Sequence, residues 1–201
     1  MTLMKKLSAY LFLILFSFLA PSFADDISDF QIEGMSVGDS LLDYFSKKEI
    51  KDNININYYA NNKYTSVEFF ELPSFEIYDS VELNYKTDDK KYIIVSVAGV
   101  LFCEKNIEKC NKKQKEIGLE LSNMFENTKK DVRKNKHNAD KSGKSTTSQI
   151  NFWLKSGEIV SIELIDWSEK ITNENGWTDN VSVILYTPDF AQWLINDSQT
   201  K

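Results

Sequence analysis

The stretch that decides the fold is QINFWLKSGEIVSIELIDW, residues 149–167. Apolar and polar side chains alternate on both sides of Ser156-Gly157, which is typical of strands with one face in the core. Glycine in a two-residue connection favours a tight turn. We therefore predict a β-hairpin with strands at 149–155 and 159–167. Six apolar side chains are expected to line the core: Ile150, Phe152, Leu154, Val160, Ile162 and Leu164.

A helical pattern precedes this hairpin. Between residues 107 and 129 the apolar residues recur every three to four positions, and the polar Gln114 fills the one gap. The opposite face is rich in lysine and glutamate, as expected of a solvated surface. The pattern predicts one long amphipathic helix.

The remaining elements follow from shorter patterns. Ser36 and Asp39 precede an apolar face and predict a helix at about 37–49, and Pro188 begins a closing helix. Alternating or β-rich runs predict further strands at 54–59, 64–71, 81–86, 92–102 and 181–186. The order indicates an α+β fold with a single antiparallel β-sheet, in which the long helix and shorter terminal helices pack on one face. Residues 25–201 are expected to form one domain.

The amino terminus predicts a secretory signal peptide at residues 1–24. Lys5 and Lys6 precede an apolar run at 7–19, and Ser22-Phe23-Ala24 has small residues at the positions typical of a cleavage site. An uncleaved anchor is the alternative, although the run is short for a bilayer. Asp25 follows the cleavage site, so the cysteine of a lipoprotein is absent. We expect a periplasmic or secreted protein with no membrane span after cleavage.

Charge is distributed unevenly along the 201 residues. The net charge is −6, and residues 1–24 contain two lysines and no acid, so their removal leaves −8; nucleic-acid binding is not expected. Residues 129–144 nevertheless carry a net charge of +5. With few apolar residues, 129–148 are predicted to form a mobile basic loop. This loop is either a solvated linker or the contact for an envelope protein or anionic envelope component, through Lys129, Lys130, Arg133, Lys134 and Lys136.

Cys103 and Cys110 are the only two cysteines. An oxidising compartment favours a disulfide between them, which would join the end of the strand at 92–102 to the start of the long helix. Two buried thiols are the alternative. No Cys-x-x-Cys motif and no neighbouring histidine is present, so neither a metal site nor a cofactor is predicted.

Motifs for catalysis are incomplete. Val37-Gly38-Asp39-Ser40-Leu41 is similar to the nucleophile block of GDSL-type esterases, a resemblance that implies Ser40 as nucleophile and Asp-x-x-His as the source of its base. The only histidine, His137, has Lys134 three residues before it. We therefore predict no catalytic residue.

Residue type alone allows two other kinds of site. The carboxylate pairs Glu68 with Glu71 and Glu163 with Asp166 could act as acid and base. Aromatic side chains bind sugar rings, and three of the four tryptophans of the carboxyl half could form such a surface: Trp153, Trp167 and Trp177.

Residues Ile32-Glu33-Gly34-Met35-Ser36 resemble the entry to the first helix of the SmpA/OmlA (BamE-like) family. These are small periplasmic α+β domains that are lipid-anchored through a cysteine, which is absent here. The resemblance implies an exported, non-enzymatic domain. Function is thus expected to be non-catalytic binding, with a secreted hydrolase (using Ser40 or a pair of carboxylates) and a carrier of a small ligand between sheet and long helix as alternatives.

Overall fold

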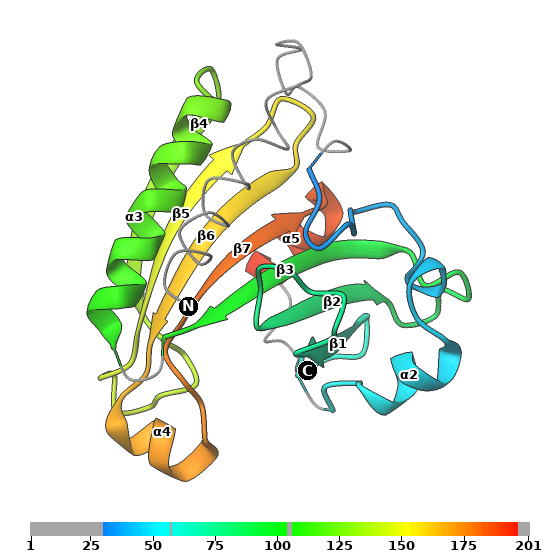
Figure 1. Ribbon diagram of the computed structural model, residues 1–201, viewed down its shortest axis with the longest axis horizontal. Helices are drawn as coiled ribbons and strands as arrows, with labels where there is room; N and C mark the ends of the chain where they lie inside the picture. The colour runs from blue at the N-terminus through cyan, green and yellow to red at the C-terminus, as the bar shows by residue number, and fades with distance from the viewer. Residues whose placement is uncertain (1–29, 57, 104–105, 197–201) are drawn as a thin grey trace.

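The structure, a computed structural model, describes residues 30–56, 58–103 and 106–196 (Figure 1). The predicted signal peptide lies outside these residues. The elements in chain order are a 3-10 helix (Leu41–Asp43), α2 (Lys47–Asp52), β1 (Tyr64–Phe70), β2 (Ser80–Lys86), β3 (Ile94–Phe102), α3 (Ile107–Met124), β4 (Lys129–Lys136), β5 (Thr146–Trp153), β6 (Ile159–Asp166), α4 (Glu169–Asn175), β7 (Asn180–Tyr186) and α5 (Pro188–Asn196).

All of these strands belong to one antiparallel sheet in the order β1-β2-β3-β7-β6-β5-β4. The predicted α+β class with a single antiparallel sheet is confirmed. The β5–β6 hairpin pairs Phe152 with Val160 and Ile150 with Ile162, as the alternation predicts. Gly157 has a φ of 100° in its turn, a conformation that a glycine adopts without strain.

The main core lies on the sheet face that α3 covers (Figure 1). Four residues of α3 are buried, at intervals of three and four positions: Cys110, Gln114, Gly118 and Leu121. The amide of Gln114 donates hydrogen bonds to the backbone oxygens of Ser148 (2.8 Å) and Ile162 (3.4 Å). Gln114, the polar residue that interrupts the apolar period, therefore hydrogen bonds the helix to the sheet.

The helix α5 packs on the other face of the sheet. Its Phe190 and Trp193 form a separate cluster with Tyr64, and Tyr186 packs against them, whereas the neighbouring Leu185 belongs to the main core. Successive residues of a strand point to opposite faces. The closing helix thus differs from the expectation that the helices share one face.

The predicted helix at 37–49 is wrong in extent. Residues 38–41 instead run beside the start of β3, where the Gly38 N–H donates to Ile94 O (2.9 Å) and the Leu41 N–H donates to Tyr92 O (3.0 Å). Because these backbone groups hydrogen bond to residues 92–94, residues 38–41 do not form an α-helix. α2 begins only after Ser46, which forms a capping box with Glu49.

Of the strand predicted at 54–59, the described residues 54–56 and 58–59 are not in strand conformation. Ile54 makes an isolated bridge with Val67, and the Asn55 N–H donates to Ser66 O (2.9 Å). The Glu68 N–H donates in turn to Asn53 O (3.1 Å). This segment therefore covers the middle of the outer edge of β1, at Ser66 and Glu68.

The predicted basic loop at 129–148 is wrong for much of its length, because residues 129–136 form β4 and β5 begins at Thr146. Every β4 residue except Asp131 is exposed, so the strand has no apolar alternation to identify it. Its pairing with β5 determines its conformation. Only residues 137–145 connect the two strands.

Candidate functional site

The strand β4 forms one edge of the sheet, and its outer side is open. The opposite edge, β1, is partly covered by residues 53–55, as described above. For β4, none of the described residues hydrogen bonds to the backbone on the outer side. An uncovered edge strand presents unpaired N–H and C=O groups that can pair with another chain.

The hydrogen-bond phase identifies which groups face outward. The His137 N–H donates to Ser145 O (2.9 Å), directly across the hairpin. In an antiparallel ladder, hydrogen-bonded residue pairs alternate with pairs that are not hydrogen-bonded. Because His137 belongs to a hydrogen-bonded pair, the odd-numbered residues of β4 direct their backbone N–H and C=O groups to β5. The outward N–H and C=O groups are therefore those of Lys130, Val132, Lys134 and Lys136.

Five of the eight β4 residues are basic, and they are the five that the sequence suggested for anion contact: Lys129, Lys130, Arg133, Lys134 and Lys136. By alternation, Lys130, Lys134 and Lys136 lie on the α3 side of the sheet, and Lys129 and Arg133 lie on the other. The one acid, Asp131, already pairs with Arg133 and accepts from the Trp153 indole N–H. The strand thus carries an excess of positive charge along its whole length.

An apolar side chain lies among these lysines: Val132 is 66% exposed. Val132 pairs with Ile150 of β5, which packs toward Gly118 of α3. The edge therefore offers an apolar contact between cationic side chains.

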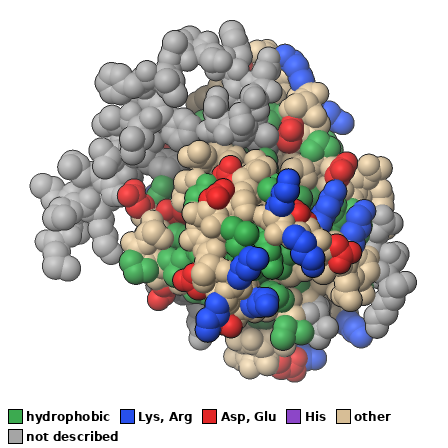
Figure 2. Space-filling model, turned by 90° about the vertical axis from the view of Figure 1, so that its right-hand side faces the viewer, with side chains coloured by type: hydrophobic (Ala, Val, Ile, Leu, Met, Phe, Trp, Pro, Cys, Tyr) green, Lys and Arg blue, Asp and Glu red, His purple; other side chains and the backbone are tan. Residues whose placement is uncertain are grey.

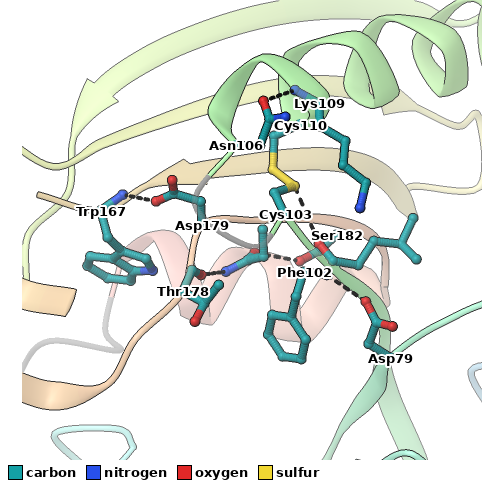
Figure 3. The surroundings of a disulfide bond; sticks show 12 residues. Asp79, Phe102, Cys103, Asn106, Lys109, Cys110, Trp167, Thr178, Asp179 and Ser182 are labelled. Carbon is teal, nitrogen blue, oxygen red and sulfur yellow. Dashed lines mark hydrogen bonds between the residues drawn. A yellow bond between two sulfur atoms is a disulfide. The ribbon is translucent and has the colours of Figure 1, made fainter. Parts of the chain in front are cut away.

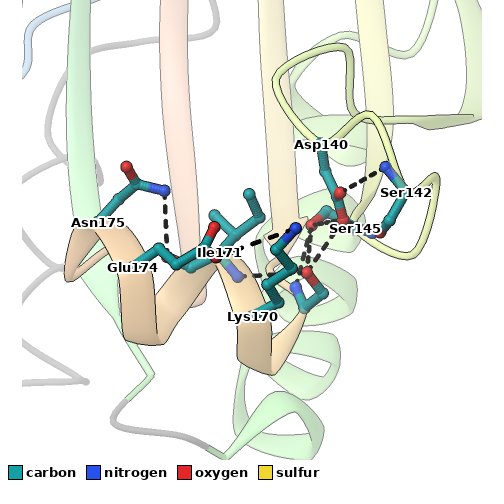
Figure 4. Close-up of polar contacts among 8 residues, drawn as sticks. Asp140, Ser142, Ser145, Lys170, Ile171, Glu174 and Asn175 are labelled. Carbon is teal, nitrogen blue, oxygen red and sulfur yellow. Dashed lines mark hydrogen bonds and ion pairs between the residues drawn. The ribbon is translucent and has the colours of Figure 1, made fainter.

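The connection between β4 and β5 is fixed by a buried carboxylate (Figure 4). Asp140 accepts hydrogen bonds from the Ser142 N–H (2.8 Å), from the Ser145 N–H (2.9 Å) and from the Ser168 hydroxyl (3.0 Å). Hydrogen bonds from Ser142 and Ser145 lower the pKa of Asp140. This network connects the hairpin turn to the start of α4. The sequence alone did not predict the network.

The disulfide joins the two elements that the sequence suggested. Cys103 and Cys110 are bonded, with their Cα atoms 5.7 Å apart, and both are buried (Figure 3). The bond connects the end of β3 to the first turn of α3. Nearby, the Phe102 N–H donates to Asp79 (2.7 Å) and the Trp167 N–H donates to Asp179 (2.8 Å), so these two backbone donors are satisfied.

A second polar cluster lies on the sheet face that carries α5. Glu82 accepts hydrogen bonds from the Tyr58 hydroxyl (3.0 Å), the Ser66 hydroxyl (3.1 Å) and the Asn84 amide (3.3 Å). Burial, reinforced by Glu68 directly across the strand pair, raises the pKa of Glu82 to about 7. The sequence analysis missed Glu82, although the polar residues at 80, 82 and 84 alternate with apolar ones.

The suggested carboxylate pairs do not form shared sites. Glu163 and Asp166 lie three residues apart in β6 and so point to opposite faces of the sheet. Glu68 lies in β1, opposite Glu82 of β2, whereas Glu71 follows the end of β1. Burial raises the pKa of both Glu68 and Glu163.

Ser40 and His137 have structural partners. The Ser40 hydroxyl donates to Lys91 O (2.7 Å) and accepts from the Leu42 N–H (3.2 Å), which caps the 3-10 helix. His137 accepts from the Ala139 N–H (3.2 Å) and packs on Trp167, with ring centroids 4.3 Å apart. Burial lowers the pKa of His137.

The three tryptophans separate into two places. Trp167 and Trp177 pack together, with ring centroids 4.7 Å apart. Trp153 instead lies beside β4, under the Lys129 ammonium, and borders a hollow of about 210 Å³ next to α5. A second hollow, of about 380 Å³, lies beside the disulfide and is bordered by Lys109, Lys112 and Lys113.

Charge is mixed on the face of the molecule that lies opposite β4. Figure 2 shows that basic and acidic side chains are interspersed on the side opposite β4. Within the described ranges, no group of three or more acidic, histidine or cysteine side chains is arranged to hold a metal ion. None of the helices described is both long and apolar enough to cross a membrane.

Comparison of the chain with protein-family models, curated proteins and solved structures finds no match. The candidate site is therefore defined by its geometry: the open edge of β4 with its basic side chains, here called the basic edge.

Proposed function

We propose that this protein is a non-catalytic binding protein of the periplasm or the extracellular space, and that the basic edge binds an anionic envelope partner. The observation that carries the proposal is the combination in one strand of an uncovered backbone edge with five basic side chains. The disulfide supports an oxidising compartment.

Electrostatics favours an anionic partner even though the whole chain is acidic. The charges of β4 are clustered, and Asp131 is the only acid within the strand. Clustered charge of one sign produces a local potential that attracts the opposite sign. The range of that attraction is about 8 Å at physiological salt, so the partner must make direct contact and its binding must weaken as salt rises.

The test reverses the charge of Lys130, Lys134 and Lys136 to glutamate. All three are exposed, so the fold should tolerate the change. We expect the variant to lose the salt-sensitive binding of the parent protein to envelope extract, measured by retention on immobilised protein at low and high salt.

A matched control reverses three exposed lysines in the β2–β3 turn, Lys86, Lys90 and Lys91, which changes the net charge equally. Equal loss in both variants would show that net charge, not the basic edge, governs binding. Undiminished binding by the β4 variant would refute the proposal.

A further inference from the structure

The outer backbone of β4 is built to accept another strand. At four alternate outward positions in regular strand conformation, the N–H and C=O groups bond to no residue that the structure describes, and residues 53–55 already show how this sheet covers part of its other edge by hydrogen bonding to β1. An extended peptide that adds to an open edge gains its affinity from backbone hydrogen bonds and its specificity from alternate side chains.

The lysines determine which strand can be added. A second copy of β4 would place like charges opposite one another, which is destabilising. An acidic strand would place carboxylates opposite ammonium groups, and direct cross-strand pairs of opposite charge are stabilising. Charge repulsion thus disfavours pairing of β4 with a second copy of β4, whereas an acidic segment has complementary charge.

We propose that the partner of the basic edge is a protein whose acidic, extended segment adds to β4 as an eighth strand of the sheet. This inference rests on the proposed function and names its partner class.

The alternation of β4 specifies a pattern for that segment. On the α3 side, the positions opposite Lys130, Lys134 and Lys136 require acids, and the position opposite Val132 requires an apolar residue. On the other side, the positions opposite Lys129 and Arg133 require acids. The positions opposite Asp131 and Asn135 require neutral polar residues.

An antiparallel probe of the same length as β4 follows directly: the peptide ETEEVTEE, labelled at one end. Its binding to the full mature chain is measured by fluorescence anisotropy at low salt, beside a scrambled peptide of the same composition. Strand addition predicts tighter binding of the ordered peptide. Equal binding of the two peptides would overturn the pattern, because charge alone would then account for the affinity.

Two backbone changes separate strand addition from charge attraction. Val132→Pro removes one outward N–H without altering any charge, and proline is tolerated in an edge strand whose N–H faces solvent. We expect its affinity for the peptide to fall about tenfold or more, because outward hydrogen bonds and close approach are lost. Val132→Thr keeps the N–H and loses only the apolar contact of the side chain, so its affinity should fall much less than that of Val132→Pro.

The peptide supplies an independent pair of variants, which keeps the test valid even if Val132→Pro does not fold. N-methylation at its third and fifth residues blocks the N–H groups that face β4, whereas N-methylation at its fourth and sixth residues blocks only groups that face away. Strand addition predicts loss of binding for the first peptide and retention for the second. Equal effects would overturn it.

The outcomes distinguish the two proposals. If charge reversal at Lys130, Lys134 and Lys136 abolishes envelope binding while Val132→Pro does not, the anionic partner stands and strand addition falls. If neither change affects binding, both fall. Binding to phosphatidylglycerol vesicles that Val132→Pro leaves unchanged, without binding of the ordered peptide, would identify a lipid surface and overturn the peptide proposal.

Discussion

At the scale of single residues, Glu82 is a side chain whose protonation near neutral pH is altered by folding. Burial raises its pKa from 4.5 to about 7, with Glu68 adding to the shift. The folded protein therefore holds this proton more tightly than the unfolded chain does. Stability from this group is full below the unfolded pKa and is lost as the pH rises through 7.

We predict that the free energy of unfolding decreases between pH 5 and pH 8, on the order of 2–3 kcal/mol for the shift at Glu82, since one pKa unit corresponds to about 1.4 kcal/mol. Glu82→Gln, which is neutral at both pH values, should remove much of this decrease. Urea unfolding at the two pH values measures it, with the exposed Glu76→Gln as control. An unchanged pH dependence in Glu82→Gln would contradict the assignment.

Single residues also show what the sequence could reveal. The gap at Gln114 was visible in the apolar period, but its meaning was not, because its acceptors are backbone oxygens of two strands far away in the chain. Glu82 was readable as a polar position in an alternating strand. Its proximity to Glu68 depended on strand register, which no local pattern specifies.

At the scale of elements, the disulfide is the covalent link between β3 and α3. The two cysteines are seven positions apart and close a short loop. A loop of this size restricts the unfolded chain only moderately, which corresponds to about 2–3 kcal/mol in the chain-entropy view.

We predict that reduction lowers the stability of the parent protein by about this amount, whereas Cys103→Ala/Cys110→Ala is insensitive to reductant. Chemical denaturation with and without reductant provides the measurement. Equal stability of oxidised and reduced parent would mean that the link does not constrain the chain. Before unfolding, alkylation should label neither cysteine, since the structure contains no free thiol among its described cysteines.

Elements were predictable where a core face produced a period. The β5–β6 hairpin and α3 follow apolar patterns that local spacing determines. The strand β4 could not be found in this way, because almost all of its side chains are exposed and only pairing with β5 makes it a strand. The segment at 37–49 failed for a related reason: its backbone bonds to β3.

At the scale of the whole molecule, the two sheet edges are treated differently. The β1 edge is partly covered by residues 53–55 of the chain itself, and the β4 edge carries basic side chains. Lysines on an edge strand prevent copies of a protein from pairing edge to edge. The same residues are those of the proposed site, so self-association through β4 would occupy that site.

We therefore predict that replacing Lys130, Lys134 and Lys136 by threonine causes self-association. Threonine favours strand conformation and removes the repulsion, so that two β4 edges can pair across a two-fold axis. Light scattering should show a concentration-dependent dimer for this variant and a monomer for the parent. Threonine at Lys86, Lys90 and Lys91 changes the net charge equally and should leave the monomer intact, because those residues lie at the β2–β3 turn, away from the open edge. A monomeric β4 variant would mean that something other than charge protects this edge, and the case for an open strand would weaken with it.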